Sequence, residues 1–119
     1  MRGGSLSGTW MVAAALLPAA VLAAEPAPLT PERQRQLVRM VRQDCGSCHG
    51  MQLTGGLGPA LTRAALADKP VEAMAATIFH GRPGTPMPGW RPLLSETEAH
   101  WIAAQLLAGF PFEPSRPSR

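Results

Sequence analysis

The chain has few of the residues on which many kinds of site depend. It contains only two cysteines and three histidines among 119 residues. A tetrahedral zinc site would need a second Cys or His pair at ligand spacing, and Cys45 and Cys48 have no such counterpart. No segment alternates apolar and polar residues as a strand does. A thioredoxin-like dithiol, which needs a βαβ context, is therefore disfavoured as well.

Charged residues of either sign are also few, and the net charge does not indicate a class of binding partner. Beyond residue 24 the chain has ten Lys and Arg and eight Asp and Glu, a formal charge of +2. Nucleic-acid binding would need a clustered basic surface, so it is not expected. The length supports one small domain with a modest core.

The longest apolar run lies at the N-terminus. Arg2 precedes an apolar stretch over residues 10–22, and small residues allow cleavage after Ala23 or Ala24. The stretch is too short to span a hydrocarbon core of about 30 Å. We therefore interpret residues 1–24 as a secretory signal peptide and expect the mature chain in the periplasm, with no membrane attachment after cleavage.

One motif in the chain indicates a particular kind of site. Residues 45–49 have the sequence Cys-Gly-Ser-Cys-His. Two thiols separated by two residues can each form a thioether with a porphyrin, and the imidazole that follows can ligate the iron. We predict one covalently attached haem c, held by Cys45 and Cys48, with His49 as an axial ligand. A structural disulfide is possible in an exported protein, but it would leave His49 without a role.

Met87 is the best candidate for the sixth iron position. It lies between Pro86 and Pro88, which deny the segment to a helix, so it is not expected to be core filler. Thioether ligation also raises the reduction potential relative to a second histidine, as suits electron transfer. His80 and His100 point away from the apolar stripes of their helices, so both are expected to be solvated.

The Gly58-Pro59 pair suggests how His49 is oriented. The free ring N–H of His49 could donate to the Pro59 carbonyl, which would fix the ligand. Leu61 would then pack on the porphyrin. The alternative interpretation of the pair is an ordinary turn.

Three helices are predicted beyond the signal peptide. The first opens at Thr30 and runs to the attachment motif, the second opens near Pro70 and ends at Gly81, and the third begins with a capping box at Ser95. A short helical piece is expected around residues 61–67. Their apolar faces carry Leu37, Met40, Val41, Cys45, Val71, Met74, Ala75, Ile78, Ala99, Ile102 and Leu106, with Trp101 at the edge of the last face. These elements predict an all-α fold.

Three segments come in the order seen in class I cytochromes c, namely residues 45–50, 58–61 and 84–90. Residues 44–61 and 80–90 resemble more closely the small c-55X type, also called NirC, which is encoded beside the cytochrome cd nitrite reductase of denitrifying bacteria. The resemblance implies a single class I cytochrome c domain, with three to four helices around one covalently bound haem.

The resemblance also implies boundaries and a ligand set. We expect the domain over residues 25–109, followed by a flexible tail over residues 110–119. The cofactor-binding residues carried over from the family are Cys45, Cys48, His49 and Met87, of which His49 and Met87 ligate the metal. There is one departure, because the glycine and aromatic residue that interlock the first and last helices of many class I cytochromes correspond to Val41 and Gln105. We therefore expect a looser helix crossing.

The implied function is single-electron transfer rather than catalysis. The carrier would donate electrons to nitrite reductase or exchange them with the enzymes that mature its haem d cofactor. Two alternatives stay open. One is a chaperone that handles haem d for the reductase, and the other is a sensor whose iron binds a small ligand, for which only His80, Arg82 and Thr85 could supply a polar group.

Overall fold

The computed structural model describes residues 3–4 and 25–110, and every regular element within them is helical. The elements are α1 (Pro31–Met40), η1 (Val41–Cys45), α2 (Gly46–His49), α3 (Arg63–Leu66), α4 (Val71–His80) and α5 (Glu96–Leu107). The predicted all-α class is thus confirmed. None of these helices is both long and apolar enough to cross a bilayer. The predicted signal peptide lies outside the described residues, apart from positions 3 and 4.

The three main helices begin where the sequence predicts. The Thr30 side chain accepts a hydrogen bond of 3.2 Å from the Arg33 N–H at the start of α1. At the start of α5, the Ser95 N–H donates to the Glu98 carboxylate over 2.8 Å, and the Glu98 N–H donates back to the Ser95 hydroxyl over 3.2 Å. These side chains satisfy N–H groups that a helix start leaves without partners. Helix α4 ends at Gly81, whose φ of +74° favours glycine.

The first helix differs from the prediction in its last turn. It is α-helical only to Met40, and Val41–Cys45 forms a π-helical turn in which the Gly46 N–H donates to the Val41 carbonyl. The turn continues directly into α2, so the chain stays helical through the attachment motif. Apolar spacing could not reveal this change, because one turn is too short for the α and π periods to diverge. Single π turns are common at functional sites.

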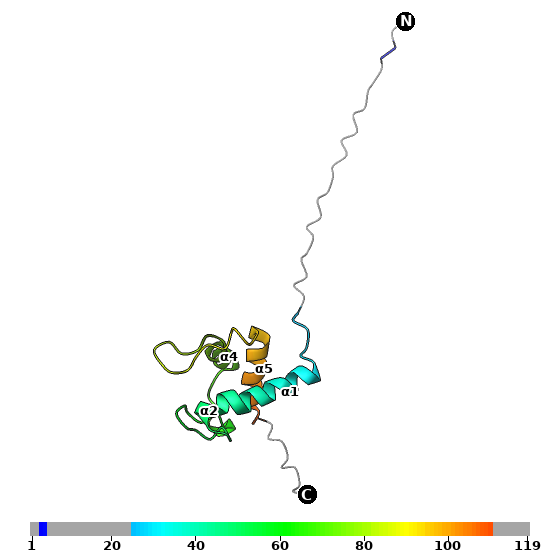
Figure 1. Ribbon diagram of the computed structural model, residues 1–119. Coiled ribbons are helices and arrows are strands. Elements are labelled where there is room, and N and C mark those ends of the chain that lie inside the picture. The colour runs from blue at the N-terminus through cyan, green and yellow to red at the C-terminus, as the bar shows by residue number, and fades with distance from the viewer. Residues whose placement is uncertain (1–2, 5–24, 111–119) are drawn as a thin grey trace.

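The core lies where α1, α4 and α5 meet. Helices α4 and α5 pack against each other, and α1 crosses α5 (Figure 1). The buried cluster consists of Leu37, Val41, Leu53, Leu66, Met74, Ile78, Leu94, Ala99, Ile102, Ala103, Leu106 and Phe110. It includes the predicted face residues Leu37, Val41, Met74, Ile78, Ala99, Ile102 and Leu106, whereas Met40, Cys45, Val71 and Ala75 are partly buried and pack against it. The predicted apolar faces are therefore confirmed.

Phe110 corrects the predicted boundary of the tail. On the sequence it opens the tail, yet its side chain is only 4% exposed and belongs to the core cluster. Gly109, with φ +85°, redirects the chain after α5, and the Gly109 N–H donates to the Leu106 carbonyl. The packed part of the domain therefore reaches at least Phe110. Residues 111–119 lie outside the described part of the chain, so their flexibility stays a prediction.

A polar contact joins α1 to α5. The Arg33 Nε donates to the Glu98 carboxylate, and the Arg33 Nη1 donates to the Gln36 side chain over 3.0 Å. Val41 is fully buried in the core, whereas Gln105 is half-buried. The looser crossing expected from Val41 and Gln105 stays a prediction.

Candidate haem site

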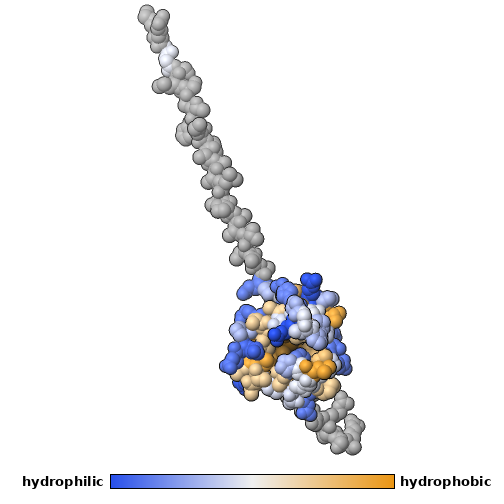
Figure 2. Space-filling view, turned by 90° about the vertical axis from the view of Figure 1, so that its left-hand side faces the viewer, coloured by the Kyte–Doolittle hydropathy of each residue, from blue (hydrophilic) through white to orange (hydrophobic). Residues whose placement is uncertain are grey.

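The predicted ligand residues come from one helix end and two loops. The segment over residues 50–62 follows α2, and the segment over residues 81–94 joins α4 to α5 (Figure 1). Figure 2 looks onto the side of the molecule where these segments lie, and apolar residues gather at its centre between hydrophilic ones. The helical packing therefore leaves an apolar surface beside the attachment motif.

His49 has one ring nitrogen engaged by the backbone. Its Nδ1 lies 2.7 Å from the Pro59 carbonyl oxygen. A carbonyl can only accept a hydrogen bond, so Nδ1 must carry the proton. The lone pair of a neutral ring then resides on Nε2, which is free to bind a metal. The predicted contact between His49 and the Pro59 carbonyl is confirmed, and its role in orienting an iron ligand stays a prediction.

Gly58 packs directly against the ring of His49. A Cβ built on Gly58 would lie 2.7 Å from both Nδ1 and Cε1, closer than real Cβ contacts. The backbone holds this approach, since the Gly58 N–H donates to the Cys48 carbonyl over 2.8 Å and the Gly55 N–H donates to the His49 carbonyl over 2.8 Å. The Gly58 backbone and the Pro59 carbonyl thus both contact the imidazole of His49 and hold it in place. Sequence reasoning missed the packing role of Gly58, although the Gly-Pro pair marks the place.

The two cysteines lie three residues apart on continuous helical backbone. Residues at this spacing are neighbours on one side of a helix. Cys45 is half-buried, Cys48 is exposed, and both are free thiols. Burial first, and then the charge of Asp44, raises the pKa of the Cys45 thiol to about 11. A redox dithiol of the thioredoxin type needs a lowered thiol pKa, so this environment argues against that alternative.

Met87 is half-buried in the loop over residues 81–94, far along the sequence from the attachment motif. The Met87 N–H donates to the Thr85 hydroxyl over 3.3 Å, and the Met87 carbonyl accepts from the Arg82 N–H over 3.2 Å. The structure thus groups Cys45, Cys48 and His49 on one helical turn and presents the methionine from a separate loop.

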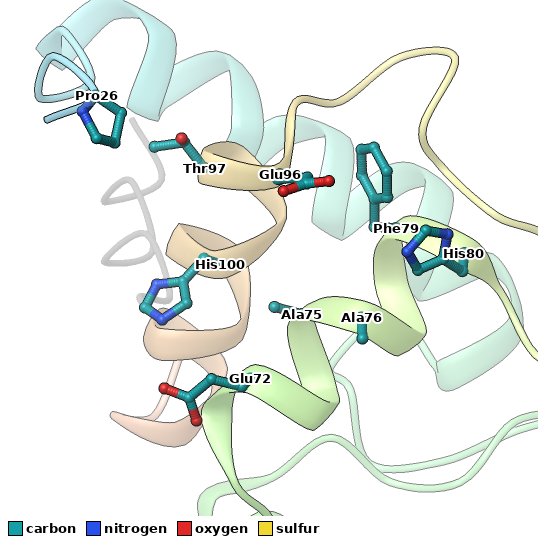
Figure 3. A pocket seen from close by; sticks show the side chains of 9 residues that line it. All are labelled: Pro26, Glu72, Ala75, Ala76, Phe79, His80, Glu96, Thr97 and His100. Carbon is teal, nitrogen blue, oxygen red and sulfur yellow. The ribbon is translucent and has the colours of Figure 1, made fainter. Parts of the chain in front are cut away.

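The histidines outside the motif line a different feature. A hollow between α4 and α5 is lined by Pro26, Glu72, Ala75, Ala76, Phe79, His80, Glu96, Thr97 and His100 (Figure 3). His80 and His100 are both exposed, as predicted. None of the four predicted ligand residues lines this hollow. Within the described part of the chain, no three His, Cys, Asp or Glu side chains gather as a metal site.

The residues present fit a covalently held haem. Two thiols on one side of a helical turn can reach one macrocycle, and the His49 Nε2 is left available by the Pro59 hydrogen bond. Gly58 packs closely against the same ring. Helices packed around such a turn, with an apolar surface beside it, define a small c-type cytochrome domain.

Comparisons with known proteins agree with this class. The model of a family described as "Cytochrome C oxidase, cbb3-type, subunit III" matches residues 32–106. Cytochrome c55X of Stutzerimonas stutzeri is 57% identical over 90 residues, which cover 76% of this chain and 77% of the relative. The solved structure of the c-type cytochrome NirC is 54% identical and covers 67% of this chain and 94% of its own, with a TM-score of 0.66. The chain therefore belongs to the cytochrome c55X family.

A longer protein contains a similar segment. The "Dihydro-heme d1 dehydrogenase" of Pseudomonas aeruginosa is 40% identical over 76 residues, which cover 63% of this chain but only 15% of that protein. The match is thus to one part of a larger molecule. Family membership makes the present chain an electron-transfer c-type cytochrome that carries haem c covalently, as the motif predicts.

Proposed function

We propose that Cys45 and Cys48 carry the haem through thioether bonds and that His49 and Met87 ligate its iron. Haem iron supplies one-electron chemistry, and the chain fixes the groups around it. The hydrogen bond from His49 to Pro59 supports the first axial ligand. The backbone bonds at Met87 support the second, because they hold its loop in one conformation.

The function that this arrangement supports best is single-electron transfer within the nitrite reductase system. The observation that carries the proposal is the match between this chain and one segment of a dihydro-haem d1 dehydrogenase. Removing hydrogen from a dihydro-haem releases two electrons, which a one-haem carrier can accept one at a time. A cytochrome module that is part of that enzyme suggests that the free-standing module serves the same cofactor. The carrier would exchange electrons with such an enzyme or with the reductase that uses haem d.

The location proposed for this exchange is the periplasm. The predicted signal peptide over residues 1–24 supports export, and covalent haem attachment in bacteria follows export. The formal charge of +2 beyond residue 24 would be cancelled by two haem propionates. Docking would then depend on apolar contact through the loop that carries Met87, where Pro86 and Pro88 are exposed and Trp90 is half-buried. Such contacts are small and short-lived, as suits a carrier.

Reoxidation of the reduced protein tests this function. We expect that catalytic amounts of cytochrome cd nitrite reductase with nitrite will oxidise the haem within seconds to minutes, followed at its α absorption band. A class I cytochrome that the reductase accepts is the positive control, and nitrite without reductase is the blank.

A reduced haem that persists while the control cytochrome is oxidised would show that the protein is not a donor to the reductase. Cofactor maturation would then be the leading function. The matching assay adds dihydro-haem d1 and its dehydrogenase to the oxidised protein, and reduction of two haem equivalents per dihydro-haem is the expected result.

A further inference from the structure

The loop that carries Met87 is held together by its own hydrogen bonds, and Thr85 is at their centre. The Thr85 hydroxyl donates to the Arg82 carbonyl over 2.7 Å and accepts from the Met87 N–H over 3.3 Å. The Arg82 N–H donates to the Met87 carbonyl over 3.2 Å. Both backbone groups of Met87 are therefore engaged inside the loop. One side chain, that of Thr85, links the residue to the rest of the loop.

The chain reversal within this loop is a tight turn of defined type. The Thr85 N–H donates to the Arg82 carbonyl over 3.1 Å, with Pro83 and Gly84 between them. Gly84 has φ +77°, which the third position of a type II turn requires, and proline is favoured at the second. The sequence alone thus favours the turn. Its conformation does not depend on contact with the core.

The two ends of the loop are closed against each other by glycines. A Cβ built on Gly81 would lie 2.5 Å from the Gly89 nitrogen, and one built on Gly89 would lie 2.8 Å from the His80 carbonyl carbon. The Trp90 N–H donates to the Ile78 carbonyl over 3.0 Å, which ties the returning chain to the last turn of α4. No side chain larger than hydrogen fits at this crossing.

We infer that the Thr85 hydroxyl is a positioning group for Met87, so that the thioether is presented to the iron by a loop that is already folded. The inference rests on the proposed ligation by Met87. A thioether is a neutral and weak ligand, and other small ligands compete with it. A loop ordered in advance lowers the entropy lost when the sulfur binds, which favours the internal ligand over its competitors.

The test compares four variants of the holoprotein with wild type in the ferric state. Thr85→Val removes the hydroxyl but keeps the shape, and Thr85→Ser restores it. The matched control is Thr77→Val, because the Thr77 hydroxyl donates to the Ala73 carbonyl over 2.9 Å inside α4, in a bond of the same kind. The measurements are the affinity for potassium cyanide and the red-end charge-transfer absorption that methionine ligation gives to ferric haem.

We expect Thr85→Val to bind cyanide about fivefold more tightly, the equivalent of one hydrogen bond, and to lose intensity in the charge-transfer band. Thr85→Ser and Thr77→Val should both behave like wild type. Thr85→Ala, which removes the same hydroxyl from an exposed position, should raise the cyanide affinity as well. This variant keeps the inference testable if Thr85→Val does not fold.

Two negative results have different meanings. If wild type shows the band, and Thr85→Val and Thr85→Ala match it in band and cyanide affinity, the Thr85 hydroxyl does not position Met87 and the inference is wrong. If wild type itself lacks the band, Met87 is not the ligand. That result overturns the proposed ligation and the inference together.

Discussion

Among the individual side chains, His49 has two contacts that hold its ring. The Pro59 carbonyl fixes one ring nitrogen and the Gly58 backbone covers the ring. Both contacts come from the chain that follows α2, so the imidazole and its support are separated by at most ten residues. Orientation of the imidazole is therefore a local property of this short segment.

Replacing Gly58 with alanine should disturb this arrangement. The added Cβ would lie 2.7 Å from ring atoms of His49, so the ring or the loop must shift. We expect the free energy of unfolding of the holoprotein to fall by about 1–3 kcal/mol, as for other overpacked sites. Denaturant titration measures the loss, and a 15N NMR spectrum should show faster exchange of the His49 Nδ1–H.

Gly46→Ala is the matched control for this change. Gly46 lies inside the attachment motif, but its nearest Cβ contact would be an ordinary 3.6 Å and its backbone is helical. We expect its effect to stay within about 0.5 kcal/mol. Equal losses in the two alanine variants would mean that the close packing of Gly58 on His49 is not what matters.

The sequence predicted the Pro59 contact but not that of Gly58, for a physical reason. A Gly-Pro pair after a histidine ligand restricts the backbone, and only a few partners can accept the ring N–H. How closely a glycine approaches the ring depends on the bonds from Gly55 and Gly58 back to α2, and these form only in the folded loop. The Gly-Pro pair therefore indicated the segment but not how closely Gly58 approaches the His49 ring.

Between the helices, the crossing of α1 and α5 depends on one carboxylate with two roles. Glu98 caps its own helix at Ser95 and accepts a hydrogen bond from Arg33. The hydrogen bond from Arg33 holds the pKa of Glu98 below its ordinary value, with the cap acting in the same direction. A carboxylate with a lowered folded-state pKa stabilises the fold above its unfolded pKa, near 4.3, and loses that contribution as the pH falls through the folded value.

Glu98→Gln should therefore destabilise the domain at pH 7, and the loss should become smaller as the pH is lowered. The amide can still serve the cap, so the loss comes from the ion pair and should be about 0.5–1 kcal/mol. The control is Glu96→Gln, which removes an exposed charge from the same first turn of α5. Urea titrations of both variants at a series of pH values from 7 down to 3 measure the difference, which should decrease as the pH falls. A difference as large at pH 3 as at pH 7 would contradict an electrostatic origin.

The helix boundaries show which features a local sequence pattern can predict. The starts of the three main helices were predicted from the caps at Thr30 and Ser95 and from the proline before α4, since these signals act within one turn. The π turn at Val41–Cys45 was not predicted, because its apolar spacing also fits an α-helix. Phe110 was misplaced because its burial depends on Gly109 returning the chain to the core.

For the domain as a unit, the twelve-residue buried cluster is a modest core, and several large apolar side chains lie outside it. Leu57 is 95% exposed, Met51 70% and Leu93 59%. A covalently held haem adds apolar surface to the core of a domain this small. The family resemblance on residues 44–61 and 80–90 predicted the cofactor and the fold together, because both segments carry the ligand motifs. The charge, by contrast, predicted no partner.

The claim that this cytochrome is an electron carrier with both axial positions filled is tested most directly by carbon monoxide. Ferrous wild-type holoprotein should not bind it, whereas Met87→Ala, which opens one position, should bind about one equivalent with a shifted Soret band. Met51→Ala is the control, since Met51 is exposed and lies beside the attachment motif, and it should behave like wild type. Prompt binding of carbon monoxide by the wild-type protein would contradict the claim and favour a ligand-binding sensor.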